Sequence, residues 1–137
     1  MPHRSVLTHA DYHHLSKLLD RIPFRDRQYF PEFQRKLEQA DLVDSTGIPP
    51  DIITLDTVVR LWSREPWTVT LVLPWQADID QDRISVLSGV GTALIGARVG
   101  DAVDWPIAGD RISARIMDIL YQPEAAGALN EPVAATG

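Results

Sequence analysis

The sequence predicts an α+β fold, with a short N-terminal antiparallel helical hairpin followed by an antiparallel sheet that contains one short helix. Two observations lead to this prediction. Apolar residues recur with a period of about 3.6 before Gly47 and of about 2 after it. The 137 residues suffice for one compact domain with a small appendage. We therefore predict a helical arm over 1–47, a sheet domain over 48–121 and a flexible C-terminal tail over 122–137.

The arm consists of two predicted helices. Thr8 can cap the first helix, which begins near His9 and ends before Pro23. The second helix begins at Pro31, because proline is favoured in a first turn, and fades over 44–47. Each helix has one apolar stripe, formed by Leu15, Leu18, Leu19 and Ile22 in the first and by Phe30, Phe33, Leu37 and Ala40 in the second. The second stripe has coiled-coil spacing, and neither helix is long enough to be stable alone, so we expect the two to pack together.

Five strands are predicted in the sheet domain, after the stiff joint Ile48-Pro49-Pro50. Runs of β-branched and alternating residues place the strands at 58–62, 68–73, 83–87, 102–105 and 111–121. Between the third and fourth strands, the apolar residues 90–95 allow a helix of one or two turns. In the last strand Ile112, Ala114 and Ile116 alternate with Ser113, Arg115 and Met117, which is typical of a strand with one buried face.

Charge is distributed unevenly along the chain. Residues 1–46 contain seven basic and seven acidic residues, whereas 47–137 contain six arginines and twelve acidic residues. The net charge of −6 therefore lies in the C-terminal part, which argues against direct binding of nucleic acid there. The chain has no apolar run of membrane-spanning length, no signal-peptide stretch and no cysteine. These features predict a cytoplasmic protein that does not bind a membrane.

Two residue patterns resemble metal sites, but each is incomplete. His9 and His13 have the spacing of two ligands on one helix face, yet no third ligand accompanies them. Asp78, Asp80 and Asp82 alternate like the start of a calcium loop, but the glycine and glutamate that complete such a loop are missing. We therefore predict surface histidines, a solvated acidic loop, and no metal or cofactor.

Patterns for nucleophilic or phosphate chemistry are also incomplete. All four histidines lie within the first 14 residues, so neither Ser85 nor Ser88 has a candidate base nearby in the sequence. The glycines between Gly89 and Gly100 lack the spacing of a phosphate-binding loop and its lysine, which favours roles in turns and caps. We predict no catalytic residues. Most of the four tryptophans are expected in the core or on the half-buried surface of the sheet, with Trp75 the one expected to be exposed.

The loop between the two predicted helices has a distinctive composition. Arg25 and Arg27 flank Asp26, and exposed-looking aromatic residues lie on both sides. Such a tip can contact a partner. It is poorly suited to a divalent cation, because a single carboxylate between two arginines presents a net positive charge.

Several strings in the second half of the chain resemble the C-terminal domain of the Gre-type transcription elongation factors. They are QAD at 76–78, RISVLS at 83–88 and GTALIGARVGD at 91–101. LYQPEAAG at 120–127 and the short arm are more similar to the Rnk group of this family, the regulators of nucleoside diphosphate kinase. The resemblance implies an FKBP-like sheet domain and a coiled-coil arm. It further implies docking on RNA polymerase, with the domain at the rim of the secondary channel and the arm directed inward.

The resemblance also assigns candidate site residues. The loop before the short helix contacts the polymerase in the family, which here corresponds to Ser88, Gly89, Val90 and Gly91; the usual Ser-Pro is replaced by Ser88-Gly89. Gre factors carry an acidic pair at the tip of a longer arm, which helps to hold a catalytic Mg²⁺ during transcript cleavage. This chain has Asp26 alone. We therefore expect a non-catalytic polymerase-binding regulator that competes with Gre factors.

Two other functions remain open from the sequence. An FKBP-like domain could be a peptidyl-prolyl isomerase, which would require an open aromatic pocket. The name of the Rnk group suggests a protein–protein regulator of nucleoside diphosphate kinase levels, although no nucleotide-binding motif is present. The sequence leaves the oligomeric state undetermined.

Overall fold

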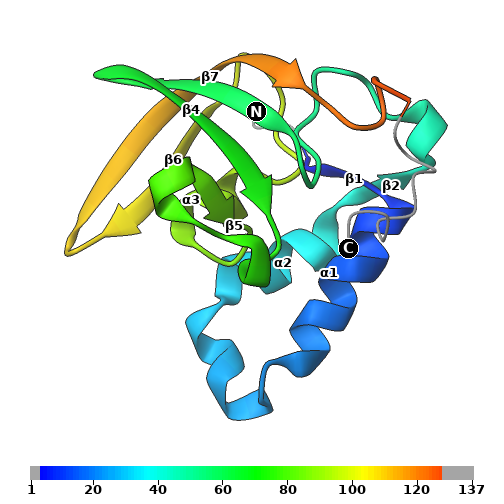
Figure 1. Ribbon diagram of the computed structural model, residues 1–137. Coiled ribbons are helices and arrows are strands. Elements are labelled where there is room, and N and C mark those ends of the chain that lie inside the picture. Colours follow the sequence, from blue (N-terminus) through cyan, green and yellow to red (C-terminus); the bar gives the residue numbers. More distant parts are fainter. Residues whose placement is uncertain (1–3, 128–137) are drawn as a thin grey trace.

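A helical arm and a curled five-stranded sheet make up most of the protein in this computed structural model, which describes residues 4–127 (Figure 1). In chain order the elements are β1 (Val6–Thr8), α1 (His9–Arg21), the 3-10 helix η1 (Phe24–Tyr29), α2 (Pro31–Gln39), β2 (Asp41–Val43), η2 (Ser45–Gly47), β3 (Val58–Ser63), β4 (Glu65–Val72), η3 (Pro74–Gln76), η4 (Ile79–Gln81), β5 (Arg83–Ser85), α3 (Gly89–Leu94), β6 (Ala102–Ile107) and β7 (Asp110–Tyr121). The mixed α+β class is as the sequence predicts.

The arm contains the two helices expected from the apolar stripes. Thr8 caps α1, since its Oγ1 accepts the N–H of Asp11 at 3.0 Å. Buried side chains from both stripes lie between the helices and the sheet domain, namely Leu15, Leu18, Phe33 and Leu37. The loop at 23–30 folds into the short helix η1, which joins α1 to α2 at the lower end of the arm in Figure 1.

The second helix ends earlier than the sequence predicts. It stops at Gln39, and residues 41–43 form β2, which pairs in parallel with β1. The N–H of Asp41 donates to the carbonyl of Ser5 at 2.9 Å. This pairing between distant segments satisfies backbone groups that a longer helix would have bonded internally, so it competes with the helix for the same residues.

The five-stranded sheet has the order β5-β4-β3-β7-β6. Three of its four pairings are antiparallel, but β4 and β5 are parallel, which corrects the prediction of a wholly antiparallel sheet. The segment between these two strands includes η3 and η4. It carries the chain back along the sheet, so that β5 runs in the same direction as β4. A crossover of this kind is what a parallel neighbour requires.

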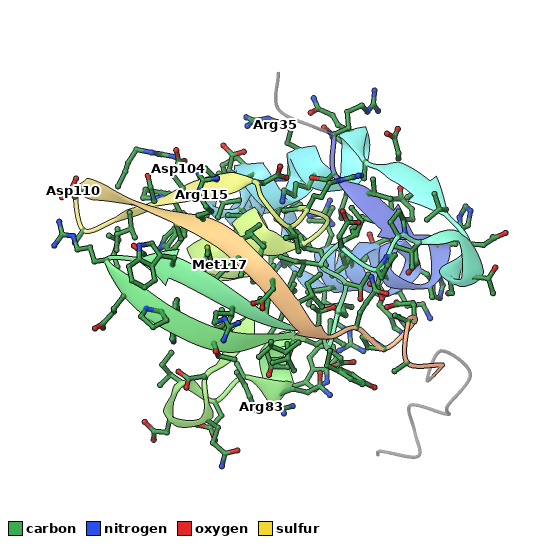
Figure 2. The ribbon with its side chains drawn as sticks, turned by 90° about the horizontal axis from the view of Figure 1, so that it is seen from above. Arg35, Arg83, Asp104, Asp110, Arg115 and Met117 are labelled. Carbon is green, nitrogen blue, oxygen red and sulfur yellow. The ribbon has the colours of Figure 1, made fainter. Side chains whose placement is uncertain are left out.

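The core lies between one face of the sheet, α3 and the arm. Ala114 and Ile116 are buried, whereas Ser113, Arg115 and Met117 are exposed, so the alternation predicted for the last strand is confirmed (Figure 2). Fully buried side chains also come from the segment before β3, from β3 and β4, and from the end of α3; they include Ile52, Ile53, Val59, Leu61, Val69, Leu71, Leu94 and Ile95.

The start of the predicted flexible tail is held against the domain. Gln122 is 3% exposed, and its Nε2 donates to the carbonyls of Pro49 and Ile52 at 2.9 and 2.8 Å. The hydroxyl of Thr54 donates to Glu124 at 2.7 Å. Residues 122–127 of the predicted tail thus contact the domain through these two side chains, and residues 128–137 lie outside the described part of the chain. None of the helices within 4–127 could span a membrane.

Candidate functional site

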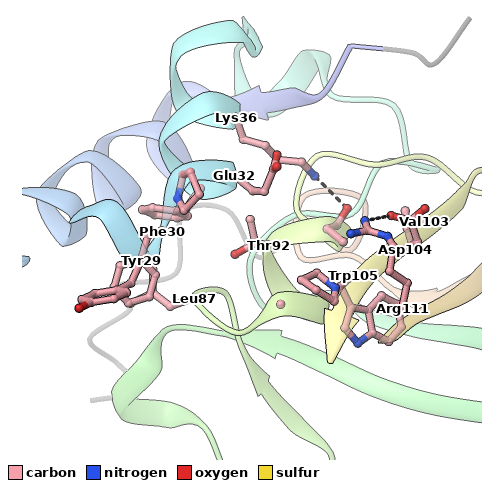
Figure 3. Close-up of a pocket in the computed structure, with 15 residues that line it drawn as sticks. Tyr29, Phe30, Glu32, Lys36, Leu87, Thr92, Val103, Asp104, Trp105 and Arg111 are labelled. Atoms are coloured by element: carbon pink, nitrogen blue, oxygen red, sulfur yellow. Dashed lines mark hydrogen bonds and ion pairs between the residues drawn. The ribbon is translucent and has the colours of Figure 1, made fainter. Parts of the chain in front are cut away.

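A cleft of about 580 Å³ lies where the arm meets the sheet domain (Figure 3). The end of η1 and the start of α2 form one wall, and α3 with the edge strand β6 forms the other. Its lining consists of Tyr29, Phe30, Pro31, Glu32, Phe33, Lys36, Leu87, Gly89, Thr92, Ala93, Val103, Asp104, Trp105, Pro106 and Arg111. A concave surface with an aromatic lining and a few charged groups is the usual form of a binding site.

Aromatic side chains from both parts of the molecule line this cleft. Tyr29 at the end of η1 is 70% exposed, whereas Trp105 in β6 is only 8% exposed. Gly89 stands beside the indole of Trp105, because a Cβ built on it would lie 3.4 Å from the Trp105 Cβ and Cδ1 atoms. The absence of a side chain at this position leaves the cleft accessible from the α3 side.

The structure divides the predicted docking segment into exposed and buried residues. Gly89 is exposed and Ser88 half-buried, but Val90 and Gly91 are buried. Ser88 caps α3, because its Oγ accepts the N–H of Gly91 at 3.0 Å and donates to the carbonyl of Ser85 at 2.7 Å. The N–H of Gly91 is therefore satisfied internally. Of the four residues, only Ser88 and Gly89 present surface to a partner.

Gly91 has a packing role that its residue type explains. A Cβ built on it would lie 1.9 Å from the carbonyl oxygen of Ser85 and 2.9 Å from the Cα of Val86. These are backbone atoms, which cannot move aside as a flexible side chain could. Only glycine lets α3 approach the end of β5 so closely, and this approach positions Gly89 at the cleft.

Lys36 fastens the arm to the sheet domain next to the cleft. Its Nζ donates to the carbonyls of Ala93 and Ile95, at 2.8 and 2.7 Å, at the C-terminal end of α3 (Figure 3). Cations are favoured at a helix C-terminus, where carbonyls lack partners within the helix. Burial lowers the pKa of Lys36 to about 8, partly offset by Glu32 and Asp101.

Asp11 makes a second buried connection between α1 and the domain. Its Oδ2 accepts the N–H of Leu55 at 3.0 Å, and the residue is 8% exposed. Burial raises the pKa of Asp11 to about 7 against the effect of the Leu55 hydrogen bond, and the nearby Glu124 and Asp56 raise it further. The charged form of this carboxyl is therefore disfavoured in the folded protein.

The arm tip has the residues that the sequence singles out, arranged around a 3-10 turn. Arg25 is exposed, while Asp26 and Arg27 are half-buried. The Nε of Arg27 donates to the Ile22 carbonyl at 3.2 Å, and its guanidinium lies 5.8 Å from the ring centre of Phe24, which is 85% exposed. The tip thus presents aromatic and basic groups with one acidic side chain.

The residues of the two incomplete metal patterns lie at the surface of the protein. His9 and His13 are exposed on α1, and Asp78, Asp80 and Asp82 are exposed around η4. Within residues 4–127, no three potential ligands lie close enough together to hold a metal ion. The carboxylate of Asp78 accepts the N–H of Asp80 at 3.1 Å, and that of Asp82 accepts the indole N–H of Trp67 at 3.0 Å, so the acidic loop has local structural bonds.

Two of the tryptophans, Trp62 and Trp75, are exposed. Trp75 is 63% exposed, as predicted, and the guanidinium of Arg21 lies 5.5 Å from its ring centre. Trp62 is 49% exposed on the outer face of β3, where it alternates with the buried Leu61.

The sequence did not indicate that Lys36 and Asp11 connect the arm to the domain, or that Trp105 lines the cleft. Asp11 stands three residues after the cap Thr8, a capping-box position that is a visible signal, although its carboxyl binds Leu55 instead of the helix start. Lys36 has no comparable signal, since its partners are 57 and 59 residues away. Trp105 was expected as core, and it is, but one of its faces also lines the cleft.

Comparison with known proteins gives consistent matches. Residues 48–121 match the family described as transcription elongation factor, GreA/GreB, C-terminal. The regulator of nucleoside diphosphate kinase of Escherichia coli (strain K12) is 27% identical over 126 residues, covering 89% of this chain and 93% of the relative. Transcription elongation factor GreA of Rhodospirillum rubrum is 31% identical over 109 residues, covering 74% of this chain and 69% of the relative.

A solved structure agrees with these sequence matches. The prokaryotic transcription elongation factor GreA/GreB from Nitrosomonas europaea superposes with a TM-score of 0.71 and 31% identity, over 87% of this chain and 99% of that chain. The matched family region contains β3 to β7 and α3, and hence one wall of the cleft. The resemblance found in the sequence is confirmed: this chain belongs to the GreA/GreB family of transcription elongation factors and is similar to the regulator of nucleoside diphosphate kinase.

Proposed function

We propose that this protein is a non-catalytic regulator that docks on RNA polymerase at its secondary channel and competes there with Gre-type factors. Family membership supports the partner, since relatives are named transcription elongation factors. One observation supports the position of the contact. Gly89 is exposed at the start of α3 and lines an aromatic cleft to which both the arm and the domain contribute. An FKBP-like sheet domain and a coiled-coil arm belong to the same proposal.

The tip supports the absence of cleavage activity in this proposal. Asp26 is one carboxylate beside Arg25 and Arg27, so the tip has a net positive charge. A hard divalent cation binds several oxygen ligands and is repelled by arginines. A 13-residue helix is also only about 20 Å long, which makes this arm short. We therefore propose that the protein occupies the channel without supplying a ligand to a catalytic metal.

Gly89→Glu tests the docking position. The substitution places a charged side chain against Trp105 at the mouth of the cleft, so we expect the Kd for RNA polymerase to rise roughly tenfold or more. Binding is measured with immobilised polymerase. Gly47→Glu is the matched control, because Gly47 is exposed and has no heavy atom within 4 Å of a built Cβ.

Circular dichroism and melting curves show whether each variant is folded. If Gly89→Glu is folded and binds as tightly as the Gly47→Glu control, the docking position is wrong. If the unmodified protein does not bind polymerase at all, the proposed function fails as a whole.

The cleft also favours a second candidate, peptidyl-prolyl isomerase activity. Trp105, Phe30 and Tyr29 give it the aromatic lining that recognition of a proline side chain requires. A proline-peptide isomerisation assay decides between the two candidates, since clear turnover that is lost in Gly89→Glu would favour the isomerase. Regulation of nucleoside diphosphate kinase, which the name of one relative suggests, would instead require an effect on the level of that enzyme.

A further inference from the structure

A second groove lies between the tips of two hairpins, β3–β4 and β6–β7. Figure 1 shows that these hairpins diverge toward their turns, and a groove of about 830 Å³ occupies the space between them. Arg111 is the one residue that lines both this groove and the cleft beside Gly89. The groove is therefore a separate surface, and nothing in the proposed docking mode uses it.

One side of the groove is an open strand edge. β7 begins at Asp110, but its pairing with β3 extends only to the pair Trp62–Arg115. In an antiparallel strand, alternate residues direct their N–H and C=O groups to opposite sides. Within 110–114, the backbone groups of Arg111 and Ser113 point away from β6, beyond the last pair with β3. The Ser113 carbonyl accepts the hydroxyl of Ser63 at the end of β3 at 2.7 Å, and the Arg111 N–H donates to Asp110 Oδ1 at 2.8 Å, which leaves the Arg111 carbonyl and the Ser113 N–H for a partner.

The charge of this groove is opposite to that of the domain around it. Arg64, Arg111 and Arg115 line it, against the single acidic residue Asp110. Arg111 pairs with Asp104. By contrast, neither Arg64 nor Arg115 forms an ion pair with a carboxylate among residues 4–127, although Nη1 of Arg115 donates to the Gly100 carbonyl at 3.2 Å. Residues 47–137 contain twelve acidic residues and only six arginines, so half of their positive charges gather at this one groove.

Apolar surface accompanies the arginines. Trp62 is 49% and Ile107 48% exposed, and both line the groove. A tryptophan next to arginines that lack acidic partners is typical of a binding surface, because both residue types contribute large energies when a partner covers them.

We propose that this groove binds an extended acidic segment of a partner protein, which adds to the open edge of β7 as a further strand. The Arg111 carbonyl and the Ser113 N–H supply hydrogen bonds, as in other cases of strand addition. Arg64 and Arg115 select acidic side chains, and Trp62 contacts an apolar one between them. Five residues of β7 span about 17 Å, which corresponds to a segment of five or six residues.

A synthetic peptide tests the proposal with the full-length protein. The probe is a capped octapeptide of alternating glutamate and valine, titrated to about 1 mM while amide NMR spectra of the protein are recorded. We expect saturable shifts at the amides of 110–114 and at the Trp62 indole, and slower hydrogen exchange at those amides. The same peptide with alternate backbone nitrogens methylated keeps its charge but lacks donors, so it should bind roughly tenfold more weakly.

Variants separate a specific site from general charge attraction. Arg115→Glu and Arg64→Glu should each weaken peptide binding roughly tenfold. Lys17→Glu makes the same change in net charge at an exposed position on α1 and should leave the affinity unchanged. Circular dichroism shows that each variant is folded, and the polymerase-binding assay should give the same Kd for Arg115→Glu as for the unmodified protein.

Several outcomes would overturn the proposal. These are no saturable shift, shifts confined to other residues, and equally tight binding of a lysine–valine octapeptide. If Lys17→Glu weakened peptide binding as much as Arg115→Glu does, the change in net charge alone would explain the loss of affinity. Preferential binding of an eight-nucleotide thymidine oligomer would make the groove a nucleic-acid site. Self-association that Arg115→Glu abolishes would make its occupant a second copy of this chain.

Discussion

At the scale of single residues, the buried Asp11 and the half-buried Lys36 connect the arm to the domain. Asp11 accepts a hydrogen bond from a backbone N–H, and Lys36 donates to two backbone carbonyls; in each case the partner segment is far away in the sequence. Burial shifts their pKa values toward neutral pH from opposite sides, to about 7 for Asp11 and about 8 for Lys36. Both shifts mean that the folded protein disfavours the charged form, so these contacts position the arm at a cost in stability.

The raised pKa of Asp11 predicts how stability depends on pH. The folded protein binds a proton more tightly at Asp11 than the unfolded chain does, so the contribution is fully present below pH 3.8 and is lost as pH rises through about 7. Between these values this group lowers the free energy of unfolding by roughly 1 kcal/mol per pH unit. Asp11→Asn should remove that slope.

Urea titrations from pH 4.5 to 8 measure this effect. We expect the Asn variant to gain stability relative to the unmodified protein as pH rises. Asp20→Asn, an exposed carboxylate on the same helix, is the control and should follow the unmodified curve. Parallel pH profiles for Asp11→Asn and the unmodified protein would show that Asp11 ionises normally.

At the scale of elements, the position of α3 depends on its close approach to β5. Gly91→Ala should destabilise the protein by about 3 kcal/mol, because the new methyl group would overlap the Ser85 carbonyl. Thermal unfolding followed by circular dichroism measures the loss. Gly89→Ala is the matched comparison within the same helix, since its Cβ would meet only ordinary contact distances of 3.4 Å and more. Equal stability of the two variants would contradict this packing.

The elements also show what could be predicted from the sequence. The main helices and strands could be predicted because their apolar residues recur periodically along the chain. The order of these elements then follows from the order of the periodic segments. The β1–β2 pairing and the parallel β4–β5 pairing could not be predicted, because each joins segments whose proximity arises only in the folded protein. The contacts of Lys36 could not be predicted for the same reason. Ser88 and Gly89 were identified through the resemblance to the family and not through their chemistry.

At the scale of the whole molecule, a short arm with a basic tip extends from the domain that matches the GreA/GreB family. If the proposed docking is correct, the protein alone should not accelerate RNA cleavage in backtracked polymerase complexes. Added to complexes that contain a Gre factor, it should lower the cleavage rate in proportion to its occupancy of the shared site. Gel analysis of labelled RNA measures both effects.

Two results would contradict this prediction. Faster appearance of short RNA fragments with the protein alone, abolished by Asp26→Ala, would show that the tip is active. Undiminished cleavage by the Gre factor at saturating protein would show that the two proteins do not share a site. Gly89→Glu serves as the control that should no longer inhibit.

The contact of Lys36 with the end of α3 has a mechanical consequence. Lys36 lies five residues after Pro31, the first residue of α2, so about 8 Å of helix and the 3-10 helix η1 separate this contact from the arm tip. A rotation of α2 about this contact would move the tip relative to the sheet domain. The two hydrogen bonds from the Lys36 ammonium group therefore help to fix the position of Arg25 and Asp26 relative to the domain.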